Sequence, residues 1–211
     1  MTDPVPAAPA AGATATAYRS DRFVAHVHTL CESKQARAAL RRGLGLPVER
    51  CTQMHRYLMP WLRDNGDPRR ADVRRAYYAV ASLIAARPRL ARDTWPHSDA
   101  TVPWYERERD NLGASLGRAV AAGVLKANSA ESALHLMARQ SSDSIHQGLP
   151  ALVRQLLGGG ITVDWVVLLV DLSRWNRDRD AVATRWLESY FRTADGTTQP
   201  DLSDADEENH R

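Results

Sequence analysis

The sequence predicts an all-α protein. Apolar residues recur with the 3.6-residue period of a helix in nearly every structured segment, and no segment shows the sustained alternation of a strand. Hydrophobic residues make up 44% of the 211 residues, so the chain can bury a core. We therefore expect a compact multi-helix bundle of about eight or nine helices, arranged either as one domain or as two packed lobes.

The expected helices follow one another with breaks at glycine, proline and polar residues. Pro60 falls inside the third of them, where it predicts a kink or a break. The predicted helices run near 20–32, 34–42, 48–64, 70–86, 114–122, 129–140, 143–157, 163–176 and 179–192.

Several helix ends carry capping signals. Asn128 followed by Glu131 is typical of a capping box, in which each side chain accepts a free backbone N–H of the first turn. The glycines at 158–160 are expected to end one helix, Thr162 can cap the next, and Asp164 is placed favourably against the dipole of that helix.

The last two predicted helices carry apolar stripes with tryptophan. A tryptophan on such a stripe could stack on a nucleic-acid base, but the stripe must be buried for the helix to be stable. We therefore assign Trp165, Trp175 and Trp186 to the core.

The composition divides the chain into three parts. Residues 1–17 are mostly Ala, Pro and Thr, and residues 193–211 hold six acids, so we expect a disordered leader and a disordered acidic tail around a helical domain at 18–192. The start has neither the basic nor the apolar region of a signal peptide, and the apolar run at 165–170 is too short to cross a bilayer. We expect a cytoplasmic protein without membrane contact, with both Cys31 and Cys51 reduced.

The net charge of +3 conceals a basic body. Residues 18–192 contain 27 basic and 18 acidic residues, a net charge of +9, and arginine supplies 26 of the 28 basic residues in the chain. This composition suggests an anionic partner. GC-rich coding, which places arginine on surfaces regardless of function, remains the alternative.

The predicted helix at 34–42 concentrates this charge. Lys34, Arg37 and Arg41 share one face with Arg42 beside it, while Ala36, Ala39 and Leu40 turn toward the core. Like charges at this spacing repel one another, and a surface selected for stability alone would intersperse acids. The stripe therefore favours phosphate contact.

A second cationic group is expected on the helix at 70–86. There Val73, Val80 and Ile84 mark the buried side, so Arg74, Arg75 and Tyr78 should point away from the core. The candidate phosphate contacts on later helices are Arg118, Arg139 and Arg154.

The segment 87–112 breaks the helical pattern with three prolines and predicts a long loop. It interleaves rings with cations, a mixture typical of single-strand binders, because cations follow phosphates while rings accept any base. A crossover whose aromatic residues pin it to the body is the alternative. The rings are Trp95, Trp104 and Tyr105, and the candidate contacts here are Arg87, Arg89, Arg107 and Arg109.

Catalytic and metal-binding signals are weak. The cluster SSDSIH at 141–146 is explained by helix capping, and no cofactor-binding or metal-ligand spacing is present, so we expect a protein that is not an enzyme and has no cofactor. The segment NLGASLG at 111–117 could present backbone donors to a phosphate, or it could be a plain turn and helix start.

Several segments, in their order and spacing over about residues 20–192, resemble a known family. They are ALRRGLG at 39–45, HRYLMPWL at 55–62, YYAVASLIA at 77–85, NLGASLGRAV at 111–120, ESALHLMARQ at 131–140, LPALVRQLL at 149–157, VDWVVLLVDLSRW at 163–175 and RWLESYF at 185–191. The family is the small-subunit (CasB) family of the type I-E CRISPR surveillance complex, Cascade. The chain departs from the family pattern at Ala114, Gln147 and Gly148.

The resemblance implies a non-catalytic, all-helical protein that packs as paired copies beside other Cascade subunits in antiviral defence. It also implies contact with guide RNA and target DNA, and stabilisation of the displaced single strand in the R-loop. The rival hypothesis is a dimeric helix-turn-helix transcription factor reading duplex DNA, because residues 36–58 offer two helices joined by a glycine turn.

Overall fold

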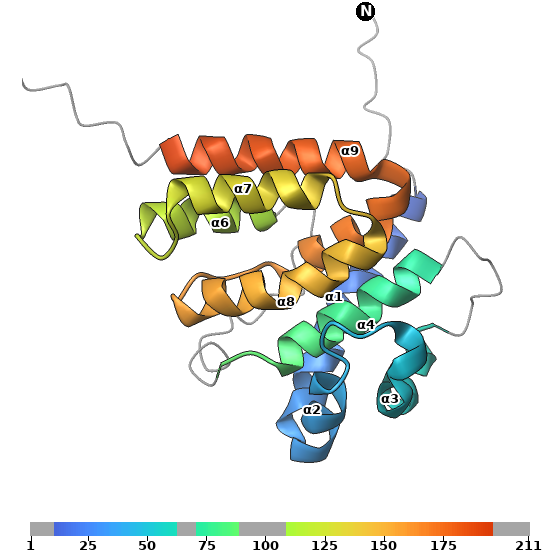
Figure 1. The fold of residues 1–211 in the computed structure, drawn as a ribbon. Helices are drawn as coiled ribbons and strands as arrows, with labels where there is room; N and C mark the ends of the chain where they lie inside the picture. The colour runs from blue at the N-terminus through green and yellow to red at the C-terminus, as the bar shows by residue number, and fades with distance from the viewer. Residues whose placement is uncertain (1–10, 63–70, 89–108, 196–211) are drawn as a thin grey trace, which may run out of the picture.

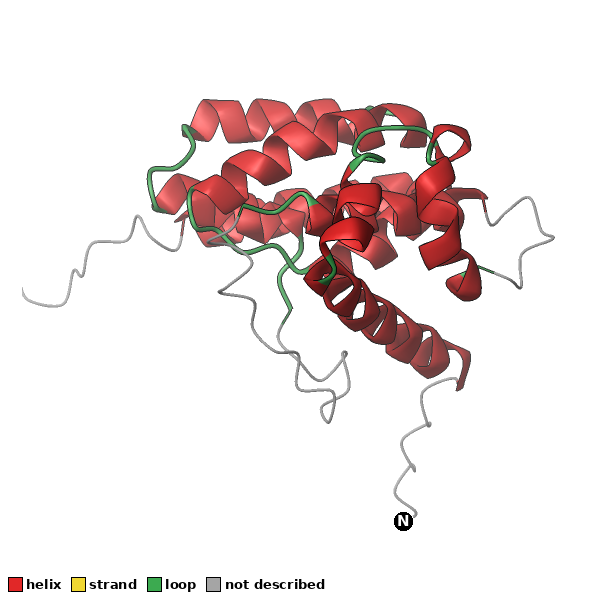
Figure 2. Cartoon of the chain, turned by 90° about the horizontal axis from the view of Figure 1, so that it is seen from below, coloured by secondary structure: helices red, strands yellow, loops and turns green. Residues whose placement is uncertain are grey.

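The computed structural model of the protein describes residues 11–62, 71–88 and 109–195 (Figure 1). Throughout these ranges the chain forms helices and loops without a strand, which confirms the all-α prediction (Figure 2). The elements are α1 (Ala11–Glu32), α2 (Lys34–Arg41), η1 (Val48–Arg50), η2 (Thr52–Met54), α3 (His55–Leu58), η3 (Met59–Trp61), α4 (Ala71–Ala85), α6 (Leu112–Ala121), α7 (Ala127–Ala138), α8 (Ser142–Gly158) and α9 (Trp165–Asp195).

One long helix joins two groups of helices. Figure 1 shows α6, α7 and the C-terminal half of α9 in an upper group, α1 to α4 in a lower group, and α8 between them. The N-terminal half of α9 packs against α4, and its C-terminal half packs against α6 and α7. Buried side chains from both groups form one hydrophobic cluster, so they share a single core.

The sequence predicts two helices where α9 runs as one element across a kink. The kink lies at Asp178, whose φ of −125° and ψ of 29° are not helical. Its two sides are tied together, because the rings of Trp175 and Trp186 lie 5.0 Å apart and Trp186 Nε1 donates to the buried carboxylate of Asp171 at 2.7 Å. The exposed fractions of Trp165, Trp175 and Trp186 are 1%, 0% and 1%, which confirms their assignment to the core.

Glycine lets α6 lie directly against the backbone of α9. A Cβ atom at Gly113 would lie 1.8 Å from the carbonyl oxygen of Trp186, and one at Gly117 would lie 2.9 Å from that of Tyr190. Asn111 caps α6 by accepting from Ala114 N at 3.1 Å. Since residues 112–117 are buried, the structure favours the second of the two alternatives for NLGASLG, a plain turn and helix start, which here is packed closely against α9.

The predicted single helix at 48–64 is wrong. The structure has four short elements there, from η1 to η3, and residues 63–70 lie outside the described ranges. The backbone of Cys51 is not helical, with a φ of −93° and a ψ of 40°. Pro60 has no backbone N–H, so it cannot donate the hydrogen bond that would continue a helix. The segment is therefore a series of single turns.

The predicted caps of α7 and α9, and the predicted start of α7, differ from those in the structure. Helix α7 begins at Ala127, so Asn128 is inside it, and Glu131 instead accepts from Tyr190 Oη at 3.5 Å. Asp164, rather than Thr162, caps α9, because its Oδ1 accepts from Val166 N at 2.9 Å and from Val167 N at 3.0 Å.

The ends of the domain are only partly described. Helix α1 begins at Ala11, inside the leader that we expect to be disordered. Residues 1–10 and 196–211 lie outside the described ranges, so the disorder of both ends stays a prediction. None of the described helices is both long enough and apolar enough to span a membrane.

Acid should destabilise the fold through His146 on α8. This histidine is 7% exposed, and neither ring nitrogen has a hydrogen-bond partner within the described residues. Burial, with a smaller contribution from the charge of Arg75, lowers the pKa of His146 to about 4 from 6.5. The unfolded chain therefore takes up this proton at a higher pH than the folded chain does, and stability is lost as the pH falls from 6.5 toward 4.

The measurement compares urea unfolding of the wild type and His146→Leu. Between about pH 7.5 and about pH 5, the wild type should lose about 2 kcal/mol more free energy of unfolding than the variant does. His135→Leu, which changes an exposed histidine of α7, should behave like the wild type. Equal pH dependence of the wild type and His146→Leu would contradict the prediction.

Candidate nucleic-acid interface

Helix α2 presents the cationic stripe that the sequence predicts. Ser33 caps the helix by accepting from Ala36 N at 3.4 Å, which sets the register of the turns that follow. The inward positions are Ala36, Ala39 and Leu40, all buried. On the other side Arg37 is half-buried, and the exposed basic residues are Lys34, Arg41 and Arg42.

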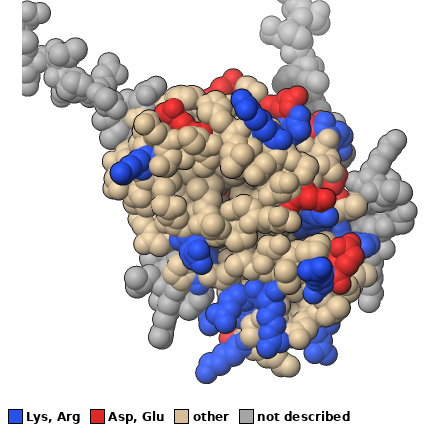
Figure 3. Space-filling view, viewed as in Figure 1, with Lys and Arg blue, Asp and Glu red and all other residues tan. Residues whose placement is uncertain are grey.

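Two more exposed arginines lie in the turns beside α2. They are Arg50 at the end of η1 and Arg56 in α3. Arg42 donates to Gln53 of η2, so the turns pack next to the stripe. Figure 3 shows basic side chains gathered at the lower end of the molecule, where α2 and α3 lie in Figure 1. We name this surface the α2–α3 cationic face, and it consists of Lys34, Arg37, Arg41, Arg42, Arg50 and Arg56.

Sequence reasoning missed Arg50 and Arg56. On the single helix expected at 48–64, residues six apart would point in directions about 120° from each other, so the pattern indicated no shared face. The short turns from η1 to α3 replace that helix. Only the charge of these two residues could have marked them in the sequence.

The second expected cationic group, on α4, is less exposed than predicted. Arg74 and Arg75 are half-buried, and Arg75 forms an ion pair with Asp143 of α8. The outward position predicted for Tyr78 is wrong. It is 3% exposed, and its hydroxyl lies 3.1 Å from His55 Nδ1. Helix α4 lies between other helices, so it buries more than one side.

Arg87 and Arg109 are internal, in contrast to the exposed loop positions that we expect. Arg87 is 5% exposed and its Nη2 lies 3.1 Å from His28 Nδ1. Burial, followed by the charge of Arg87, lowers the pKa of His28 to about 3. Arg109 is 10% exposed and forms ion pairs with Asp21 at 2.8 Å and Asp164 at 3.5 Å. Both guanidinium groups hold elements of the fold together in this structure.

The other candidate arginines are scattered. Arg118 is half-buried and forms an ion pair with Asp110, while Arg139 and Arg154 are exposed after α7 and on α8. Arg89 and Arg107 lie outside the described residues, as do the rings at 95, 104 and 105. The structure thus places the residues of the predicted α2 stripe together and separates them from the rest.

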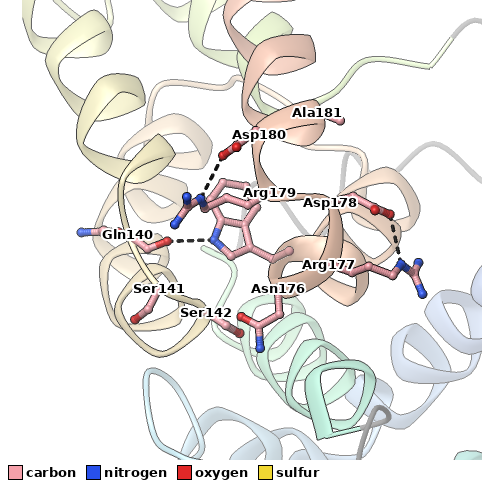
Figure 4. Close-up of a pocket in the computed structure, with 10 residues that line it drawn as sticks. Gln140, Ser141, Ser142, Asn176, Arg177, Asp178, Arg179, Asp180 and Ala181 are labelled. Carbon is pink, nitrogen blue, oxygen red and sulfur yellow. Dashed lines mark hydrogen bonds and ion pairs between the residues drawn. The ribbon is translucent and has the colours of Figure 1, made fainter.

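A hollow beside the kink of α9 is a weaker candidate for an anion site. Trp175 forms part of its wall and donates from Nε1 to the carbonyl oxygen of Gln140 at 3.1 Å (Figure 4). Its two arginines are each paired at 3.2 Å with the next residue along the chain, in the pairs Arg177–Asp178 and Arg179–Asp180. The charges of these pairs cancel, so the hollow lacks the excess of positive charge found on α2.

The geometry does not fit the helix-turn-helix alternative. Within residues 36–58 the chain has the end of α2, then two 3-10 turns and the four residues of α3. A recognition helix must be long enough to lie in a major groove, which a single turn cannot do. Among the described residues no group of three or more His, Cys, Asp or Glu side chains could hold a metal ion.

Taken together, the described residues define an all-helical protein with an arginine-rich face on α2 and α3. The model of one protein family, described as CRISPR-associated protein Cse2, matches residues 36–191. The chain therefore belongs to the Cse2 family of CRISPR-associated proteins.

Solved structures agree with this membership. A chain described as part of a "CRISPR RNA-guided surveillance complex" is 39% identical, with 87% of this chain and 97% of that chain covered and a TM-score of 0.72. A second, described as the same kind of complex before nicking, is 40% identical, with 85% and 96% covered and a TM-score of 0.73.

A CasB structure from Thermus thermophilus is 25% identical, with 82% of this chain and 97% of that chain covered and a TM-score of 0.60. The resemblance to the CasB family that the sequence suggests is thereby confirmed. No curated protein matches the chain.

Proposed function

We propose that the protein is a non-catalytic, nucleic-acid-binding subunit of a CRISPR RNA-guided surveillance complex of the type I-E Cascade class. In this role it stabilises the hybrid of guide RNA and target DNA, and the displaced strand, through contacts between arginine and phosphate. Its partners are guide RNA, both strands of target DNA, other subunits and a second copy of itself, in the cytoplasm. The observation that carries the proposal is the α2–α3 cationic face on a member of the Cse2 family.

Modest phosphate contacts suffice for this role. Replacing a DNA duplex by a hybrid of guide and target is a nearly balanced exchange, so contacts that neutralise the opened strands can shift the equilibrium. The hybrid itself reads the sequence, and arginine side chains need only follow the backbone. Six basic residues on one surface, with Glu49 as the exposed acid of η1 and Glu32 at the end of α1, suit this sequence-independent contact.

The first test uses the isolated full-length protein. It should bind single strands and duplexes of random sequence, with an affinity that falls steeply as salt rises, because binding releases counterions from the phosphates. In a competition assay, a random single strand should compete at least as well as any duplex. An affinity that is unchanged between low and physiological salt, or a preference for one duplex sequence, would contradict the proposal.

A second test addresses the complex. The protein should co-purify with partners that carry guide RNA. When it is added to a guide-RNA complex that lacks this subunit, the permanganate reactivity of thymines in the displaced strand should persist for longer. An unchanged lifetime of the open strand would remove the support for a stabilising role.

A further inference from the structure

A second surface feature, on α1, α3 and η3, combines aromatic rings with cations. The guanidinium carbon of Arg22 lies 6.0 Å from the centre of the Trp61 ring, and that of Arg56 lies 5.8 Å from the centre of the Tyr57 ring. His26 adds a third ring, 5.4 Å from Trp61. We name these five residues of α1, α3 and η3 the ring–arginine patch.

The rings of the patch pack against the core on one side and are partly exposed to solvent on the other. Phe23, which is fully buried, meets Trp61 edge-on at a ring distance of 5.7 Å. Arg19 donates to the carbonyl oxygen of Trp61, which fixes the backbone of η3 against α1. Tyr57, Trp61 and His26 are half-buried, whereas Arg22 and Arg56 are exposed. The rings are therefore positioned by the core and still reachable from outside.

The patch continues the α2–α3 cationic face. Arg56 belongs to both surfaces, and Tyr57 follows it directly in α3. Figure 1 shows α3 beside α2 at the lower end of the fold. A strand whose phosphates follow the cationic face would therefore bring its next nucleotides to Tyr57 and Trp61.

We propose that the ring–arginine patch binds unpaired bases of single-stranded nucleic acid by stacking. The inference rests on the proposed function and deepens it, because it assigns single strands a contact that duplexes lack. The combination of rings and cations suits such a ligand, since a base of any kind has a face that can stack while arginine contacts the adjoining phosphate.

The arginine above Trp61 indicates how a base would enter. A guanidinium is planar, stacks on aromatic faces and here belongs to an exposed, rotatable side chain, so it marks a ring face that another planar group can occupy. When a base takes this place, Arg22 swings to the phosphate. The base thus replaces the cation–π contact of Arg22, and the net gain lies at the lower end of the range for stacking on an aromatic side chain.

The test compares two oligonucleotides of equal length on the full-length protein. One is oligothymidylate, and the other has the same phosphates with abasic sugars. Wild-type protein should bind oligothymidylate roughly 5- to 10-fold more tightly. In Trp61→Leu this difference should disappear, while the dependence of binding on salt stays unchanged. Trp61→Phe, which keeps a ring, should retain part of the difference.

Controls separate stacking from folding and from charge. Phe191→Leu changes an aromatic residue that is 40% exposed at the far end of α9, and it should keep the full difference. Arg22→Ala and Arg56→Ala should each lower the salt slope by roughly 1 unit, if each residue contacts one phosphate. Thermal unfolding shows whether Trp61→Leu has folded.

A cross-linking experiment on the wild type needs no substitution. An oligonucleotide with 5-iodouridine should cross-link on irradiation to a peptide that contains Tyr57 or Trp61. Equal binding of the two oligonucleotides by the wild type, or cross-links only elsewhere, would overturn the stacking proposal while leaving the proposed function intact. If neither oligonucleotide binds with a dependence on salt, the proposed function itself fails.

Discussion

Replacing Arg37, Arg41 and Arg42 together with alanine is expected to weaken nucleic-acid binding on the order of 100-fold at physiological salt. Each contact between a cation and a phosphate contributes about 0.9 to the slope of log K against log salt on duplex DNA, so three lost contacts should lower the slope by about 2 to 3 units. The loss should be the same for all sequences, because phosphate contacts carry no base information.

The fold should tolerate these three substitutions. Arg41 and Arg42 are exposed and Arg37 is half-buried, and alanine is a strong helix former. The hydrogen bond from Arg42 to Gln53 is exposed, and its loss is offset by relief of repulsion along the stripe. The melting temperature should change by no more than about 2–4 °C.

A matched variant distinguishes the stripe from positive charge in general. Arg174, Arg177 and Arg192 are exposed arginines of α9, and changing all three to alanine removes the same charge from positions outside the α2–α3 cationic face. This variant should keep most of the affinity and of the salt slope. If both triple variants behave alike, the stripe is only part of a uniformly basic surface. If the α2 variant unfolds, its arginines stabilise the fold.

The substitution Gly113→Ala is expected to cause a large loss of stability. Its Cβ would lie 1.8 Å from the carbonyl oxygen of Trp186 and 2.8 Å from the Cα of the same residue. These are backbone atoms, which cannot rotate away, so α6 and α9 must separate. Overpacking of this kind costs about 3 kcal/mol or more, which corresponds to a fall in the melting temperature of roughly 6–12 °C.

The control for this prediction is Gly158→Ala at the end of α8. No atom lies within 4 Å of the Cβ that the substitution would add, and the glycine is exposed. Alanine also favours helix, so stability should be unchanged or slightly raised. Calorimetry of both variants checks the contrast. A melting temperature of Gly113→Ala equal to that of the wild type would show that the two helices do not approach as closely as described.

Local patterns predicted most of the helices because the relevant interactions span only three or four residues. The helices near 70–86, 114–122, 129–140 and 143–157 correspond to α4, α6, α7 and α8 with small shifts at their ends. The segment 48–64 failed because its apolar spacing also suits single turns, and the break at Cys51 carries no local signal. Two separate helices are predicted where the structure has one helix with a kink at Asp178. A local pattern does not show whether a break bends a helix or ends it.

The arginines illustrate the limit of such prediction for the candidate site. The orientation of the α2 stripe followed from its period, since Ala36, Ala39 and Leu40 face the core as expected. The internal position of Arg109 could not be predicted from a helical period. Its partners Asp21 and Asp164 are distant in the sequence and meet it only after α1 and α9 have packed.

By itself the sequence determined the helical class, the buried face of α2, the tryptophans of the core and the resemblance to a family. Each of these depends on the order and spacing of residues along the chain. Only the tertiary structure decided which arginines are free to meet phosphate and which neutralise buried acids, and only it brought Arg22 over Trp61. The physical reason is that burial and ion pairing depend on contacts between distant segments, and identical guanidinium groups take opposite roles according to what packs beside them.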